Sequence, residues 1–188
     1  MVYKRWVNKR DDKNNIIKTK ETKEKSSSLK SPHVYDLVFN SGWFELKAAR
    51  ALVEQVGIQK ESIQLNCIFS DKNGKAKNEI DIIANLGNRL LFVECKTMIY
   101  ESTDIDKFNS ALKNFSGISS AKLFMTNDQP PKEENDNPYW LAMDKCDNYK
   151  IGKFNFYLDK NKGNINTVMQ QKALKDIVGE LRNIQNKK

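Results

Sequence analysis

Hydrophobic residues recur with a helical period from Ser41 to Val56 and alternate as in β-strands further along the chain. Within that first segment, Ala48, Ala49 and Leu52 share one face, and Ser41 is a suitable helix cap. The pattern then predicts strands over 63–69, 79–84, 89–97 and 121–126, with a helix over 104–115. The resulting order, α-β-β-β-α-β, is typical of an α/β domain.

Weaker patterns flank this core. We expect a helical turn over 34–39, a short helix over 139–146, a strand over 151–158 and an amphipathic helix over 168–184. Residues 1–33 are rich in Lys, Asn, Thr and Ser, so we expect a disordered tail there, followed by one domain over 34–188. The tail is either a solubilising linker or a basic arm that contacts phosphates.

Composition and charge narrow the class of protein. The 188 residues carry a net charge of +8, and the sequence pI is about 9.3, which favours a polyanionic partner, nucleic acid first. No apolar run approaches the roughly 20 residues of a membrane span, and residues 1–6 lead into Lys, Asp and Asn, so we expect no secretory signal there. Three scattered Cys indicate free thiols in the cytoplasm, and a single His makes a Ser-His-Asp triad improbable.

The charge is distributed unevenly. Residues 1–33 hold ten basic and four acidic residues, a net of +6, and residues 151–188 hold eight and three, a net of +5. Residues 34–150 hold 14 basic and 17 acidic residues, a net of −3. The excess positive charge therefore lies at the two ends of the chain, and the central segment is slightly acidic.

Charged residues interrupt two otherwise apolar strands of this central segment. Glu94 and Lys96 are two positions apart, so they share one face of their strand, whereas Cys95 points to the other face. If Gly87-Asn88 forms a two-residue turn, Leu86 pairs with Arg89 and the register places Asp81 opposite Glu94. Two carboxylates this close repel each other unless a cation lies between them.

Glu45 adds a further carboxylate, because it lies on the apolar face of the first predicted helix. It is either a solvated residue at the helix start or an acid directed at the sheet. A simpler interpretation of the whole set is a surface hairpin with an ordinary Asp and a Glu–Lys ion pair. The full pattern is more specific than a surface ion pair requires, because an Asp is followed after twelve residues by Glu-x-Lys, and a helix with an inward Glu precedes both.

The set resembles the PD-(D/E)xK nuclease superfamily, and within it the nuclease domain of CRISPR ancillary nucleases that carry a CARF-type sensor domain. The matching stretches read Ser41-Gly42-Trp43-Phe44-Glu45, Asn78-Glu79-Ile80-Asp81 and Asn88-Arg89-Leu90-Leu91-Phe92-Val93-Glu94-Cys95-Lys96-Thr97. The resemblance covers roughly residues 34–126. It implies a restriction-endonuclease-like core with a mixed sheet flanked by helices. In the family, a second acid often follows the first after Gly-Trp, whereas Leu46 follows Glu45 here, and the chain is too short for a CARF domain as well.

The resemblance also implies an active site. Asp81, Glu94 and the backbone carbonyl of Cys95 would hold Mg²⁺ or Mn²⁺, since hard ions prefer oxygen ligands. Lys96 would orient or help deprotonate the attacking water, and Glu45 would hold a water of the metal or a second ion. Lys107 and Lys113, on the following helix, are candidates for contact with nucleic-acid phosphates.

We therefore expect a cytoplasmic, metal-dependent endonuclease that acts on DNA, RNA or both in prokaryotic or mobile-element defence. It would have no membrane association, and a homodimer is possible. A restriction enzyme or Holliday-junction resolvase on the same core is one alternative. A nucleic-acid-binding module without catalysis is another, although such a module has no need of the Asp81, Glu94 and Lys96 set.

Overall fold

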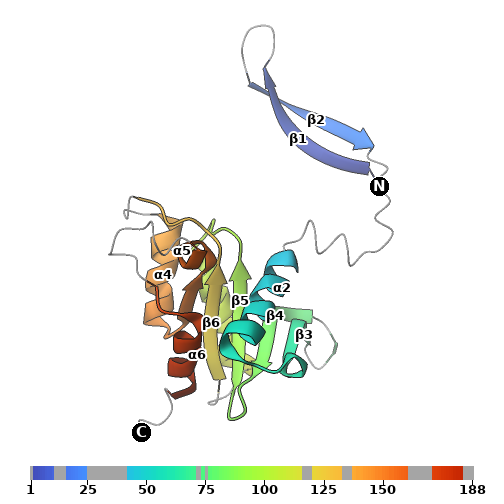
Figure 1. Cartoon of the computed structure of the whole chain (residues 1–188). Coiled ribbons are helices and arrows are strands. Elements are labelled where there is room, and N and C mark those ends of the chain that lie inside the picture. Colours follow the sequence, from blue (N-terminus) through green and yellow to red (C-terminus); the bar gives the residue numbers. More distant parts are fainter. Residues whose placement is uncertain are drawn as a thin grey trace. The chain divides into compact units, whose positions relative to one another are not determined.

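A computed structural model provides the structure of the chain (Figure 1). It describes residues 2–10, 16–24, 42–70, 73–74, 76–115, 120–132, 137–160 and 171–183. The chain divides into two units, Met1–Asn40 and Ser41–Lys188, and each is described by itself. The helical turn expected over 34–39 lies outside the described residues.

The first unit contains a β-hairpin. Strand β1 (Val2–Arg10) pairs antiparallel with β2 (Ile16–Glu24), in a register that runs from Val2↔Glu24 to Arg10↔Ile16. This arrangement differs from the disordered tail that we expected over 1–33. β-Branched residues are frequent in both stretches, and Tyr3 and Trp6 add aromatic residues to β1; all of these favour strands even where lysine is abundant.

The second unit is built on a mixed five-stranded sheet with the order β3-β4-β5-β6-β7. The strands are β3 (Ile63–Ser70), β4 (Ala76–Asn85), β5 (Leu90–Lys96), β6 (Ser120–Thr126) and β7 (Gly152–Asn155). The first three pair antiparallel, whereas β6 is parallel to both β5 and β7. The predicted α/β fold with a mixed sheet flanked by helices is confirmed.

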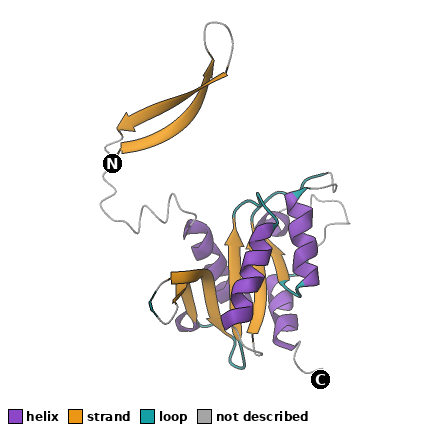
Figure 2. Ribbon diagram, turned by 180° about the vertical axis from the view of Figure 1, so that it is seen from behind, coloured by secondary structure: helices purple, strands orange, loops and turns teal. Residues whose placement is uncertain are grey.

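Helices cover both faces of this sheet. On one face lie α2 (Gly42–Ala51), continued by a π-helical turn over Leu52–Val56, and α6 (Leu174–Asn183). On the other face, toward the viewer in Figure 2, lie α3 (Thr103–Phe115) and α4 (Pro138–Asn148). The sheet therefore separates two hydrophobic cores, which we call the α2 core and the α3 core. The α2 core includes Phe44, Ala48, Val93 and Cys95, and the α3 core includes Phe92, Phe108 and Phe124.

The chain departs from the predicted pattern after β7. We expected a strand over 151–158, but it ends at Asn155, and a short helix, α5 (Phe156–Lys160), follows. The side chain of Asn155 accepts a hydrogen bond from the amide of Tyr157 at 2.8 Å, which caps this helix. The outward amide and carbonyl of Asn155 are both bonded to the side-chain amide of Gln171.

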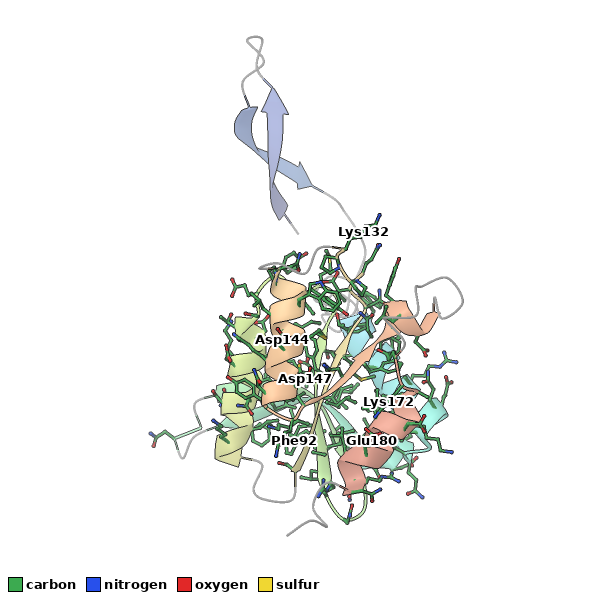
Figure 3. The ribbon with its side chains drawn as sticks, turned by 90° about the vertical axis from the view of Figure 1, so that its left-hand side faces the viewer. Phe92, Lys132, Asp144, Asp147, Lys172 and Glu180 are labelled. Atoms are coloured by element: carbon green, nitrogen blue, oxygen red, sulfur yellow. The ribbon has the colours of Figure 1, made fainter. Side chains whose placement is uncertain are left out.

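Helix α6 packs closely on β7, the edge strand of the sheet (Figure 3), and Lys172, just before the helix, forms an ion pair with Glu180 on it. The sequence pattern predicted a helix from 168, whereas α6 begins at Leu174, and residues 161–170 lie outside the described residues. Gly152 makes the close approach possible, because a Cβ there would lie 2.9 Å from Leu181 Cδ1 and 3.0 Å from Ile177 Cγ2. None of the described helices combines the length and the apolar character that a bilayer span requires.

Candidate active site

The β4–β5 hairpin has the register predicted from its turn. The amide of Leu86 donates to the carbonyl of Arg89 at 2.9 Å, and Gly87 has a φ of +93°, as a tight turn between these strands requires. The pairs run from Asn85↔Leu90 to Ile82↔Val93. Asp81 and Glu94 are the next two residues on their strands.

The two strands diverge at that point. On the N-terminal side of Ile82, β4 pairs only with β3. On the C-terminal side of Val93, β5 pairs only with β6, up to Lys96↔Thr126. A fork opens in the sheet between them, and we call it the β4–β5 fork. Asp81 lies on one branch and Glu94 on the other.

The Asp81 side chain bridges this fork. Its carboxylate Oδ2 accepts a hydrogen bond from the amide of Cys95 at 2.6 Å. Burial raises the pKa of Asp81, although this hydrogen bond and the charge of Lys96 act in the opposite direction. The sequence register placed Asp81 opposite Glu94. The structure shows in addition that the Asp81 carboxylate accepts the hydrogen bond of the Cys95 amide, which has no backbone partner on β4 because β4 and β5 no longer pair there.

Glu94 and Lys96 form an ion pair on β5. Lys96 Nζ lies 3.1 Å from Glu94 Oε1, and the Glu94 side chain is only 13% exposed. Burial and the neighbouring charge of Asp81 raise the pKa of Glu94 to about 7, even with Lys96 beside it. Burial opposes the charge on Lys96, but Glu94, Asp104 and Asp81 together raise the pKa of its ammonium group.

Glu45 approaches the same fork from the first turn of α2. Burial, followed by the charges of Asp81 and Glu79, raises the pKa of Glu45 to about 7. Ala48, one turn further along α2, is fully buried, so the helix comes close to the sheet here. The charges that act on Glu45 belong to residues of β4 and β5, which favours the interpretation of an acid near the sheet.

Two further acids act on this site, and the sequence analysis gave them no role. Glu79, on β4, contributes to the pKa shifts of Glu45 and Asp81, and Asp104, in the first turn of α3, contributes to those of Glu94 and Lys96. The sequence could have indicated a role for Glu79, because it lies two residues before Asp81 on the same predicted strand. Asp104 precedes the apolar stripe of a helix, which is also where a purely structural acid is favoured.

The two lysines proposed to contact phosphates differ in position. Lys107 is 70% exposed and forms an ion pair with Asp104 at 3.2 Å, so it lies at the end of α3 that faces the fork. Lys113 is also exposed but lies nine residues beyond Asp104, roughly 14 Å along the helix. The structure therefore brings Lys107 near the carboxylates and leaves Lys113 at the far end of α3.

The loop after Lys96 is anchored rather than free. The amide of Ile99 donates to Asp128 Oδ2 at 2.8 Å, and the Ile99 side chain is buried in the α3 core. Asp128 is itself bonded through its carbonyl to Asn155. These contacts fix the chain three residues beyond Lys96, so the end of β5 is held in place.

Comparison with known proteins identifies the family. A model of the Card1-like endonuclease domain matches residues 34–132, which include the whole fork. The chain belongs to the Card1-like endonuclease domain family. The site therefore lies in an endonuclease domain, and Glu45, Asp81, Glu94 and Lys96 all fall inside the matched range.

One solved structure shares the fold of this Card1-like domain. Can2 from Sulfobacillus thermosulfidooxidans, solved in complex with cyclic tetra-adenylate, is similar with 21% identity and a TM-score of 0.50. The match covers 70% of this chain and 36% of that one, so the present chain spans about a third of the Can2 length. Protein VC1899 from Vibrio cholerae matches with 17% identity and a TM-score of 0.49, over 82% of this chain and 36% of that one. A search of curated proteins returned no match.

The donors at the fork of this Card1-like domain are of the type that Mg²⁺ and Mn²⁺ prefer. Asp81 and Glu94 provide carboxylate oxygens, and the backbone of Cys95 adds a carbonyl. Across the described ranges, no group of three or more His, Cys, Asp and Glu side chains is arranged as a ready-made metal cluster. A set of two carboxylates and one carbonyl fits such an ion without requiring a third side chain.

Proposed function

We propose that this domain hydrolyses phosphodiester bonds of DNA, RNA or both with the help of Mg²⁺ or Mn²⁺. The observation that carries the proposal is the convergence of Asp81 and Glu94 beside Lys96 at the β4–β5 fork. The raised pKa values of Glu45 and Glu94 support it, because three neighbouring acids are a poor arrangement for stability alone. A divalent cation would compensate for their mutual repulsion.

Each residue at the fork would have its own role in the reaction. Asp81, Glu94 and the carbonyl of Cys95 would hold the ion, which when bound supplies a Lewis acid that polarises a phosphoryl oxygen. Lys96, held by Glu94 at 3.1 Å, would orient the attacking water and stabilise the negative charge that develops on the phosphate. Glu45 would accept a hydrogen bond from a water at the entrance of the fork.

The charge distribution supports a nucleic-acid substrate that is attracted by the ends of the chain. Residues 1–33 and 151–188 carry net charges of +6 and +5, whereas the segment that contains the fork is slightly acidic. Long-range attraction would come from the ends, and the cation would make the fork itself acceptable to a phosphate. Lys107 is the described lysine of α3 best placed to contact the substrate near the fork.

The biological setting we propose is cytoplasmic CRISPR-associated or mobile-element defence, with a homodimer as one possible assembly. The family match supports this setting, together with the shared fold of Can2. Cyclic tetra-adenylate is the ligand named for the Can2 structure, and the aligned part is 36% of that protein. Control by such a ligand is therefore not part of the proposal for this chain.

A cleavage assay tests the proposal. Purified protein is incubated with single- and double-stranded DNA and RNA in Mn²⁺, in Mg²⁺ and with EDTA. We expect cleavage of at least one substrate that EDTA abolishes, and a loss of about 10²–10⁴-fold in rate for Lys96→Ala. Lys132→Ala, which changes an exposed loop lysine, is the matched control and should cleave as wild type does.

The same assay separates the alternatives. Binding without EDTA-sensitive cleavage of any substrate would favour a nucleic-acid-binding module. Exclusive cleavage of four-way junctions would favour a resolvase, and cleavage at one fixed duplex sequence would favour a restriction enzyme. Wild-type rates in Lys96→Ala would show that the assigned role of Lys96 is wrong.

A further inference from the structure

Asn66 adopts an unusual backbone conformation in the interior of β3. Its φ is +51°, in the left-handed region that residues other than glycine rarely occupy. Among the described non-glycine residues, Lys150 also has a positive φ, but it lies in a turn after α4. Asn tolerates this region because its short polar side chain can bond locally, whereas a β-branched residue is strongly disfavoured there.

This position lies across the sheet from Asp81. Leu65 pairs with Ile82 and Cys67 pairs with Ile80, so the register places Asn66 opposite Asp81, yet these two residues do not form a pair. Because β4 and β5 also stop pairing after Ile82, the Asp81 backbone has no strand partner on either side. The interruption of β3 and the β4–β5 fork thus coincide at one residue.

The β3–β4 ribbon turns over at the same point. Leu65 and Ile82 pack against the α2 core, whereas Phe69 and Ile80 pack against the α3 core. Ile80 and Ile82 are two residues apart and would share one face in a regular strand. A left-handed residue in β3 supplies the local change of direction that this reversal requires.

We propose that Asn66 is a positioning residue for the active site. Its left-handed conformation prevents β3 from pairing with Asp81 and turns the ribbon over, so that the Asp81 carboxylate reaches the amide of Cys95 inside the fork. This inference rests on the proposed function where it assigns Asp81 to metal binding. The placement of Asp81 itself is a structural statement that can be tested without any metal.

Hydrogen exchange of the Cys95 amide in the metal-free protein provides that test, because this amide donates to Asp81 Oδ2. Asn66→Val favours extended backbone at position 66 and should speed Cys95 exchange relative to Val93 by about tenfold, from the usual cost of the left-handed region. Asn66→Gly keeps that region accessible and should leave the ratio as in wild type. Ile68→Val, at an exposed position of the same strand, is the matched control and should also leave it unchanged.

Mn²⁺ titration of the same variants links the placement to the site. Asn66→Val should weaken Mn²⁺ binding by about tenfold, because a smaller fraction of molecules holds Asp81 in the competent position. Asn66→Ala also disfavours the left-handed region, but less strongly than Asn66→Val. It therefore tests the same role if the valine variant does not fold. It should shift both measurements in the same direction.

The outcomes distinguish this inference from the proposed function. Unchanged Cys95 exchange in both Asn66→Val and Asn66→Ala would overturn the positioning role. Faster exchange with unchanged Mn²⁺ affinity would overturn the link to the metal site. Faster exchange in a protein whose wild type binds no Mn²⁺ would support the placement of Asp81 while removing the proposed metal function.

Discussion

The carboxylate of Asp81 accepts a hydrogen bond from the backbone amide of Cys95, 2.6 Å away, at the first position where β4 and β5 no longer pair. One side chain thus both closes the gap between two strands and presents an acid at that gap. Its two functions can be separated by substitution.

Asp81→Asn removes the charge and keeps an oxygen that can accept the Cys95 hydrogen bond. We expect the fold to be preserved and Mn²⁺-dependent cleavage to fall by about a hundredfold or more, in the range typical for the loss of a group that stabilises the reacting charges. Circular dichroism checks the fold, and the cleavage rate checks the function. Asp144→Asn, on the exposed side of α4, is the control, and full activity in Asp81→Asn would contradict the assigned role.

Metal affinity should depend on pH. The pKa values of Glu45 and Glu94 are both about 7, and under the proposed function Mn²⁺ would bind the deprotonated carboxylate of Glu94. Raising the pH from 6 to 8 should therefore tighten Mn²⁺ binding by about tenfold for each proton displaced. Calorimetric titration at the two pH values provides the measurement. Equal affinities at pH 6 and pH 8 would show that Glu94 is not a ligand.

Glu45→Gln should stabilise the metal-free protein. Burial and the charges of Asp81 and Glu79 raise the pKa of Glu45 from 4.5 to about 7, so its ionised form is disfavoured in the fold. The sign follows directly: below pH 4.5 the acid is neutral in both folded and unfolded chains, and the variant gains nothing. The gain grows as pH rises from 4.5 to 7 and is complete above 7.

Thermal unfolding at pH 4 and pH 8 measures this effect. At pH 8 we expect a higher Tm by a few degrees, since about 1 kcal/mol shifts the Tm of a domain of this size by about 2–4 °C. Glu61→Gln, at an exposed position just before β3, serves as the control. A lower Tm for Glu45→Gln at pH 8 would mean that the charge of Glu45 is stabilised in the fold.

The packing of α6 on β7 gives a prediction about stability alone. Gly152→Ala would place a methyl group 2.9 Å from Leu181 Cδ1, so we expect a loss of about 1–3 kcal/mol through overpacking. Gly179→Ala, in the middle of α6 with nothing within 4 Å of the new Cβ, should instead gain about 0.5–1 kcal/mol from helix propensity. Urea unfolding of both variants checks the contrast. Equal effects would show that α6 does not pack on Gly152 in solution.

Much of the site could be predicted from the sequence, because its register depends on one short turn. Gly87-Asn88 allows a two-residue connection, and the alternation of apolar residues then fixes which residues of β4 and β5 meet. The helical period placed Glu45 on an apolar face, but it left open whether this acid is solvated or directed at the sheet. The hydrogen bond from Cys95 to Asp81 was not, because it depends on where the strands separate.

The reversal of the β3–β4 ribbon also could not be predicted from the pattern of hydrophobic and polar residues. Ile80 and Ile82 suggest a single buried face, but the left-handed conformation of Asn66 sends them to different cores. Asn is common in ordinary loops and turns, so its presence in a strand carries no specific signal. The end of β7 was missed for a similar reason, since nothing in the sequence indicated that Asn155 caps α5, and the predicted strand was continued to residue 158.

Gln171 has a consequence for the behaviour of the protein at high concentration. Its side-chain amide occupies both outward hydrogen-bonding groups of Asn155, the last residue of the edge strand β7. An exposed strand edge is a template on which other molecules can stack and aggregate. A strand from another molecule would have to displace Gln171 here, so a single side chain protects this end of β7 from edge-to-edge pairing.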